Sequence, residues 1–135
     1  MKSLVVDDEE LCRRKMEKIM GIAGECIGVE KGIYALTRFL NALESKDPFD
    51  VITLDISMPE MDGLQVLFEI RQMEKEWRIP RENRVKIIMV TSQSDKDTVV
   101  TALQAGCDDY VVKPFDGGTM MKKLQKLGVA VPVGR

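Results

Sequence analysis

The sequence predicts an α/β fold in which five parallel β-strands alternate with five α-helices. Five short apolar runs, at 3–6, 26–29, 51–54, 85–90 and 110–112, are separated by stretches with helical periodicity. Most of these runs are almost continuously apolar, which is typical of parallel strands that are covered on both faces. An alternating order of strands and helices implies a parallel sheet with helices on both of its sides.

Each predicted helix presents one apolar face. Between the first two strands, apolar residues recur at the spacing of a single helix face, and the same holds for the four later stretches. The sequence Ser-Asp-Lys-Asp at 94–97, with Ser94 as the cap, marks the expected start of the fourth helix. The five faces are, in chain order, Cys12, Met16, Ile19, Met20 and Ala23; Leu36, Phe39, Leu40 and Leu43; Val66, Ile70, Met73 and Trp77; Val99, Val100 and Leu103; and Met120, Met121, Leu124 and Leu127.

The order of the strands in the sheet follows from the rules of parallel connections. Right-handed crossovers leave few topologies for five strands, and we expect the flavodoxin-like (βα)5 order 2-1-3-4-5. The strand starts are 23, 25, 34 and 25 residues apart, so the third interval is the long one, with its extra residues around 73–84. We expect one domain over residues 1–127 and a tail over residues 128–135.

The composition argues against several classes of function. With 20 basic and 22 acidic side chains, the net charge of −2 argues against direct binding of nucleic acid through bulk positive charge. The chain has no histidine, which removes Ser–His and Cys–His catalysis and imidazole metal sites. Its three cysteines are scattered, as expected for free thiols in a reducing cytosol. No apolar stretch approaches the roughly 18 residues of a membrane span, so we expect a cytoplasmic protein without membrane insertion.

Three acidic side chains stand at the ends of predicted strands. Asp7 and Asp8 follow the first strand, and Asp55 follows the third. In the order 2-1-3-4-5 these two strands are neighbours, and ligands of such sheets bind beyond the carboxyl ends of the strands. At about 4 Å and an effective dielectric constant of about 20, each pair of carboxylates would repel by roughly 4 kcal/mol. Oxygen ligands arranged in this way favour a hard cation such as Mg²⁺.

A simpler interpretation is that these acids are solvated and cap helices, with Asp8 or Glu9 at the start of the first helix. That interpretation explains Asp7 or Asp8 alone as well as a metal site does, but it does not explain Asp55 at the matching end of another strand. Glu9 and Glu10 keep the simpler interpretation, because acids in the first turn are favoured by the helix dipole.

Two further side chains complete the predicted site. Thr91 ends the fourth strand and Lys113 follows the fifth. Taken singly, Thr91 is more often a strand-end cap and Lys113 more often a surface lysine. Beside three carboxylates they supply a hydroxyl and an ammonium group. That combination suits phosphoryl transfer to a carboxylate, with Lys113 and a metal ion neutralising the phosphoryl oxygens.

The motifs that contain these residues resemble those of the receiver domain of bacterial response regulators. They are VVDDEE (5–10), LDISMPEMDG (54–63), VTS (90–92) and YVVKPF (110–115), and they occur in the order found in that family. The resemblance covers residues 1–127 and implies a phosphorylation-activated signalling switch. It implies no enzyme activity beyond the protein's own phosphorylation and dephosphorylation.

The resemblance also implies a role for each residue of the phosphorylation site. Asp55 would accept the phosphoryl group, Thr91 would bind it and Lys113 would pair with it. The bond between Lys113 and Pro114 matches one that is cis in the family. Tyr110 matches the family's switch aromatic, although a half-buried aromatic in an amphipathic strand explains the same residue more simply.

The metal ligands implied by the resemblance come from the same sheet edge. Asp8 and Asp55 would bind Mg²⁺ directly, and Asp7 would bind it through water. The backbone carbonyl of Ser57 would add a further ligand, so the type of its side chain matters little for that role.

The resemblance suggests partners as well. The phosphoryl group would come from a histidine kinase or a phosphotransfer protein. Output is expected at the face formed by the fourth helix, the fifth strand and the fifth helix, which would bind a downstream protein or a second copy of the chain. The natural start and the lack of an output domain favour a free-standing, chemotaxis-like regulator, and a receiver module cut from a larger regulator is the alternative.

Two other classes of protein share parts of this pattern. A haloacid-dehalogenase-like phosphatase also uses an Asp after an apolar strand, but it needs a second Asp where this chain has Ser57, and it needs a cap domain. A flavodoxin-like FMN binder needs a phosphate-binding loop after the first strand, where the acids at 7–10 would repel a phosphate.

Overall fold

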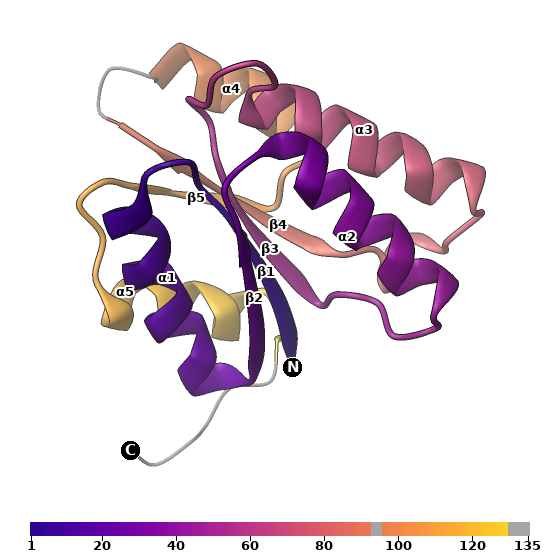
Figure 1. The fold of residues 1–135 in the computed structure, drawn as a ribbon, viewed down its shortest axis with the longest axis horizontal. Coiled ribbons are helices and arrows are strands. Elements are labelled where there is room, and N and C mark those ends of the chain that lie inside the picture. The colour runs from indigo at the N-terminus through magenta and orange to yellow at the C-terminus, as the bar shows by residue number, and fades with distance from the viewer. Residues whose placement is uncertain (93–95, 130–135) are drawn as a thin grey trace.

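The computed structural model describes residues 1–92 and 96–129, in which strands and helices alternate as predicted (Figure 1). Each strand lies within one residue of its predicted bounds. The elements are β1 (Lys2–Val6), α1 (Glu10–Ala23), β2 (Glu25–Val29), α2 (Gly32–Glu44), β3 (Val51–Asp55), α3 (Gly63–Glu76), η1 (Arg81–Asn83), β4 (Lys86–Thr91), α4 (Lys96–Gln104), β5 (Asp109–Val112) and α5 (Gly117–Lys126).

The five strands are all parallel and form one sheet in the order β2-β1-β3-β4-β5, which confirms the predicted topology. Val6 at the end of β1 is in register with Leu54 of β3, and Asp55 is in register with Val90 of β4. The carboxyl ends of β1, β3 and β4 therefore lie side by side at one edge of the sheet. The acidic residues Asp7, Asp8 and Asp55 were predicted to lie at this edge.

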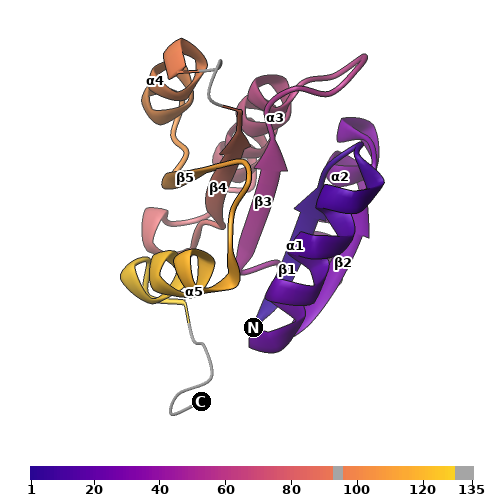
Figure 2. The same ribbon diagram turned by 90° about the vertical axis from the view of Figure 1, so that its left-hand side faces the viewer.

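Helices cover both faces of the sheet (Figures 1 and 2). One core, with α1 and α5 on the sheet, contains Met20 and Leu124, and the other, under α2, α3 and α4, contains Phe39 and Ile70. Successive strand residues enter opposite cores because side chains alternate along a strand. No helix in the described part of the chain is both long and apolar enough to cross a membrane.

The start of α3 is fixed by two local features. The carboxylate of Asp62 caps the helix by accepting a hydrogen bond from the backbone N–H of Gln65 at 2.9 Å. Gly63 packs so closely on the backbone of Asp55 that a Cβ atom there would collide with the Asp55 carbonyl. Its N–H donates to the carbonyl of Ile56 at 2.9 Å. The helix start thereby holds the carboxyl end of β3 in place.

The predicted apolar face of α4 is partly wrong. Val99 is buried as predicted, but Val100 and Leu103 are 56% and 46% exposed, and Ala102 is buried instead. Val99 and Ala102 are three residues apart and share the face toward the sheet, whereas Val100 and Leu103 lie about 100° further round the helix. The predicted cap of this helix, Ser94, lies outside the described residues.

The long third interval forms an extended α3 followed by a turn. The helix continues to Glu76, and Trp77 stands at its carboxyl end, 45% exposed rather than part of the core as predicted. Arg78 has a φ of 55°, and this left-handed conformation ends the helix. The short helix η1 then leads the chain back to β4. We call residues 77–86 the α3–β4 turn.

Candidate functional site

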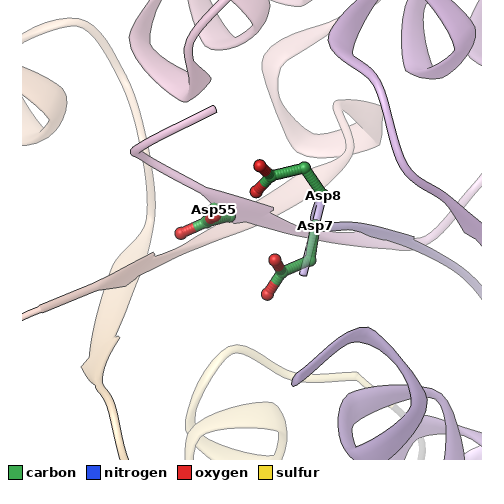
Figure 3. A group of neighbouring side chains, drawn as sticks. All are labelled: Asp7, Asp8 and Asp55. Atoms are coloured by element: carbon green, nitrogen blue, oxygen red, sulfur yellow. The ribbon is translucent and has the colours of Figure 1, made fainter. Parts of the chain in front are cut away.

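Three carboxylates meet at the carboxyl edge of the sheet (Figure 3). Asp7 and Asp8 directly follow β1, and Asp55 ends β3. Each offers an oxygen atom, and these atoms lie within 4.8 Å of one another. Asp7 and Asp55 are buried whereas Asp8 is exposed. Figure 3 shows the three carboxylates projecting to the same side of the two strand ends, so they lie together as predicted.

Lys113 lies against two of these carboxylates. Its Nζ is 3.3 Å from Oδ2 of Asp7 and 3.5 Å from Oδ1 of Asp55. The backbone N–H of Lys113 donates to the carbonyl of Thr91 at 2.7 Å, and the bond between Lys113 and Pro114 is cis, as the resemblance implies. Burial alone would lower the pKa of Lys113, but the carboxylates of Asp55 and Asp7 outweigh it and raise the pKa above the ordinary lysine value. Lys113 therefore carries its positive charge at neutral pH.

The environment of Asp55 disfavours its negative charge. Burial and the nearby charge of Asp7 raise the pKa of Asp55 from 3.8 to about 7, against the opposing effect of Lys113. One ammonium group thus does not compensate for three carboxylates. The site takes up positive charge, either as a proton or as a cation.

The donor set fits a magnesium ion. All three side chains offer carboxylate oxygens, the ligand type that Mg²⁺ prefers. With Mg–O distances of about 2.1 Å, two oxygens on opposite sides of one ion are about 4.2 Å apart. The observed spread of up to 4.8 Å is close to this value, so small side-chain rotations bring the oxygens of Asp7, Asp8 and Asp55 within reach of one ion. Ser57 lies two residues beyond Asp55 in the β3–α3 loop, and the role of its carbonyl stays a prediction.

Thr91 and Tyr110 occupy different positions relative to the carboxylates. Thr91 is 2% exposed at the end of β4, one residue beyond the partner of Asp55 in the sheet, and its hydroxyl donates to the carbonyl of Ser92 at 3.0 Å. Tyr110 is 39% exposed on β5, and the Nζ of Lys123 lies 5.6 Å from the centre of its ring. Tyr110 therefore stands outside the cluster of carboxylates, in an outward conformation.

Sequence reasoning missed two contacts that orient Asp7. The backbone N–H of Glu9 donates to Oδ1 of Asp7 at 2.9 Å, and Nη1 of Arg13 donates to the Asp7 carbonyl at 3.2 Å. The first contact is the turn that an aspartate commonly makes with the backbone two residues on, so the sequence carried a signal for it. The second depends on how α1 is oriented after β1, and no local pattern indicates it.

The raised pKa of Asp55 predicts an unusual dependence of stability on pH. The folded protein keeps the Asp55 proton up to about pH 7, whereas the unfolded chain releases it near pH 3.8. Stability without metal should therefore fall as pH rises through this range. Because water still reaches the mouth of the site, we expect a loss on the order of 1–2 kcal/mol between about pH 5.5 and about pH 8. Denaturant unfolding in the presence of a chelator measures it.

Asp55→Asn is the matched control for this prediction, because it removes the titrating group and keeps the side-chain shape. The chain has no histidine, so few other groups titrate in the same range. Saturating Mg²⁺ should replace the proton and stabilise the wild-type protein most at the higher pH, and Asp8→Asn should weaken this effect. An equal pH slope in wild-type protein and Asp55→Asn would contradict the prediction.

Comparison with known proteins gives one family and relatives of very different size. The sequence matches the response regulator receiver domain family over residues 3–125. A chemotaxis protein CheY homolog of Campylobacter jejuni is 35% identical over 127 residues, which make up 93% of this chain and 90% of that protein. Hybrid signal transduction histidine kinase L of Dictyostelium discoideum is 36% identical over 128 residues, which are 94% of this chain but only 7% of the kinase.

Solved structures show the same architecture. The structure of Vibrio cholerae chemotaxis protein CheY4 has a TM-score of 0.75 and 27% sequence identity, and the match covers 93% of this chain and 97% of that one. The fold is therefore found both in proteins of similar length and as a short part of a much larger protein.

Proposed function

The chain belongs to the response regulator receiver domain family, whose members are phosphorylation-activated signalling switches, and we propose that Asp55 is the residue that accepts the phosphoryl group. One observation carries this assignment. The carboxylate of Asp55 is buried at the sheet edge with the ammonium group of Lys113 at 3.5 Å and two further carboxylates within 4.8 Å. Asp7 is also buried and lies 3.3 Å from the same ammonium group, and the position of Asp55 in the family motif at the end of β3 distinguishes the two.

The proposed reaction is transfer of a phosphoryl group to a carboxylate oxygen. An oxygen of Asp55 forms a bond with phosphorus while the bond from phosphorus to the donor's nitrogen or oxygen breaks, and the donor leaves with that electron pair. Lys113 faces the oxygens that gain charge, and Thr91 ends the adjacent strand, from which its hydroxyl can bind the transferred group. The acceptor is the protein itself, so the proposal includes no turnover of a separate substrate.

Asp7, Asp8 and Asp55 would hold the Mg²⁺ ion, together with the backbone carbonyl of Ser57. When bound, the ion supplies positive charge that reduces the repulsion between an anionic donor and the acidic site. Lys113 supplies a positive charge of the chain itself within 3.5 Å of two of these carboxylates. A donor phosphate therefore meets both the ion and Lys113 at the mouth of the site.

The partners follow from the same proposal. The donor would be a histidine kinase or a phosphotransfer protein, encountered in the cytoplasm. The output face would be α4, β5 and α5, where Val100, Leu103, Tyr110 and Val112 are exposed.

Family membership sets aside the dehalogenase-like and FMN-binding alternatives, and Ser57 and the acids at 7–10 are consistent with this.

Incubation with a small phosphodonor tests the proposal directly. With acetyl phosphate and Mg²⁺, intact-mass spectrometry should show the addition of a single phosphoryl group, and a chelator should prevent it. A protein that stays unmodified with Mg²⁺ present, while remaining folded, would contradict the proposed function.

Phosphorylation should also move Tyr110. A phosphoryl group adds about −1.5 to −2 charge and several acceptor oxygens beside Thr91, whose hydroxyl would leave the carbonyl of Ser92 to bind them. Space would open behind Thr91, and the ring of Tyr110 would turn inward and away from Lys123. With a beryllofluoride adduct at Asp55, NMR should show large shifts at Thr91, Tyr110 and Val112.

Two controls make this prediction specific. Signals of α2 from Leu36 to Leu43, on a helix far from β5 in the sheet order, should barely change. Thr91→Ala should still form the adduct but lose the large shift at Tyr110, because the hydroxyl that couples the two residues is absent. Shifts confined to residues that touch Asp55, with Tyr110 unmoved, would show that this switch does not operate here.

A further inference from the structure

Four basic side chains around the α3–β4 turn form no ion pair within the described residues. They are Lys75, Arg81, Arg84 and Lys86, and all of them line one hollow of about 480 Å³ beside the loop that follows α4. Elsewhere, several basic residues are paired, as Arg14 is with Glu10. Four unpaired cations around one concave surface leave a concentrated positive charge that an anionic ligand would neutralise.

We call this hollow the basic hollow. Hydrogen bonds of Arg71 hold its floor together. Arg71 donates from Nε to the carbonyl of Gly106 at 3.0 Å and from Nη1 to Oε1 of Glu74 at 2.7 Å. Its Nη2 donates to Oδ2 of Asp108 at 3.0 Å, and the same oxygen accepts from the N–H of Ile87 at 2.8 Å. Asp108 is the one acidic residue in the lining, and these two contacts engage its carboxylate. Arg71 balances only one of the two carboxylates of Glu74 and Asp108, so the network carries a charge of −1 and the four surrounding cations leave a net charge of +3 at the hollow.

The position of Arg84 also prepares the hollow for a ligand. Its Nε donates to the carbonyl of Ile79 at 3.2 Å, which fixes the direction of the side chain. Among the described residues its two terminal nitrogens have no partner. An arginine held in this way binds phosphate through parallel hydrogen bonds with less loss of side-chain freedom.

From this geometry we propose that the basic hollow binds the phosphate chain of a small molecule, either an inorganic oligophosphate or a nucleotide. Its volume lies within the range of roughly 300–1,000 Å³ found for small-molecule sites. Four unpaired cations match the charge of a chain of two or three phosphates. The lining contains no aromatic residue, so a base would find no stacking surface and the phosphates would be the part recognised. The net charge of −2 disfavours a long nucleic acid as the ligand.

The basic hollow lies at the opposite end of the sheet from the carboxylates. Lys86 begins β4 and Thr91 ends it, so the strand separates the two sites by about 17 Å at a rise of about 3.3 Å per residue. In Figure 1 the turn after α3 lies at the right, whereas β4 runs toward the left, where its carboxyl end leads to α4. The proposed ligand therefore occupies a site separate from the one that accepts the phosphoryl group.

Titration of the metal-free protein tests the proposal. Tripolyphosphate and ATP are added separately, in a chelator and at about 0.15 M salt, so that weak surface attraction is screened and no Mg²⁺ draws phosphates to Asp55. Saturable NMR shifts are expected at Lys86, Gly106 and Cys107, with Val6 unchanged. Equal affinities would identify the phosphate chain as the whole determinant, and clearly tighter binding of ATP would identify a nucleotide as the ligand.

Variants on the turn separate this site from general charge effects. Lys75→Gln and Arg81→Gln alter exposed side chains that make no hydrogen bond in the described structure, so both should fold. Each should weaken binding roughly tenfold, and the double variant roughly a hundredfold. Arg78→Gln is the matched control, because Arg78 lies on the same turn but lines a neighbouring hollow. It should leave affinity within about twofold of wild type.

Three results would overturn the proposal. They are the absence of saturable binding of either ligand below millimolar concentration, shifts centred on residues outside the basic hollow, and equal weakening by Arg78→Gln and Arg81→Gln. Acetyl phosphate labelling of the Lys75 and Arg81 variants should stay at the wild-type level. That measurement confirms that each variant is folded and keeps its acidic site.

Discussion

Asp55→Asn should reduce phosphorylation by acetyl phosphate to background, whereas the wild-type protein becomes labelled in the presence of Mg²⁺. The amide of asparagine carries no negative charge and is too weak a nucleophile to form an acyl phosphate. Asp7 is equally buried and also contacts Lys113, so the map of the label separates Asp55 at the end of β3 from Asp7 after β1. The label on wild-type protein should be sensitive to hydroxylamine, as an acyl phosphate is, and should map to the peptide that contains Asp55.

Loss of labelling in this variant should not reflect unfolding. Asparagine has the shape of aspartate, and its neutral side chain relieves the repulsion that raises the pKa of Asp55. Without metal, Asp55→Asn should therefore be at least as stable as the wild-type protein at about pH 8. Undiminished labelling of the variant, or a wild-type label that maps to Asp8 or Ser57, would show that the acceptor has been assigned incorrectly.

The sequence was sufficient to predict the strands and their order. Continuous apolar runs indicate strands buried on both faces, and few right-handed topologies connect five of them. The burial of individual helix residues was less predictable. In α4, Val99 and Val100 are equally apolar but point about 100° apart, and Val99 shares the buried face with the small Ala102. Trp77 is apolar too, yet it follows the last residue of α3 and is exposed.

The candidate site was predictable because its residues stand at strand ends. Asp7, Asp55 and Thr91 each follow an apolar run, so strand order alone brings them together. Contacts that depend on helix orientation could not be predicted in this way. The bond from Arg13 to the Asp7 carbonyl and the position of Lys123 over Tyr110 both join a helix side chain to a strand end. Such contacts depend on tertiary packing, which no local pattern encodes.

A buried ionic network was the largest feature that the sequence did not reveal. Arg71 contacts Glu74 and Asp108 at 2.7 and 3.0 Å, and the side chain of Glu74 is only 1% exposed. The second oxygen of Glu74 accepts from the N–H of Val85 at 2.8 Å. In the sequence, Arg71 and Glu74 read as an ordinary pair of charges on a helix surface. In the structure both side chains are largely buried, and the network joins α3 to the starts of β4 and β5.

Arg71→Met should destabilise the fold by about 4 kcal/mol, because it leaves the carboxylate of Glu74 buried without its positive partner. In a chain of this length the loss corresponds to a fall in Tm of roughly 10–20 °C. Thermal and denaturant unfolding of the variant measure both quantities. The effect comes from the charge that remains behind, so it should exceed that of removing an exposed ion pair such as Lys2–Asp47, for which we expect at most about 1 kcal/mol.

A second variant isolates this cause. In Arg71→Met combined with Glu74→Gln, the charge is gone and the amide oxygen can still accept from the N–H of Val85. Much of the lost stability should return, giving a coupling energy of about 2–3 kcal/mol between the two positions. If the double variant is no more stable than Arg71→Met, the destabilisation comes instead from the lost bonds to Gly106 and Asp108. In that case Arg71 acts by joining the starts of β4 and β5 rather than by neutralising Glu74.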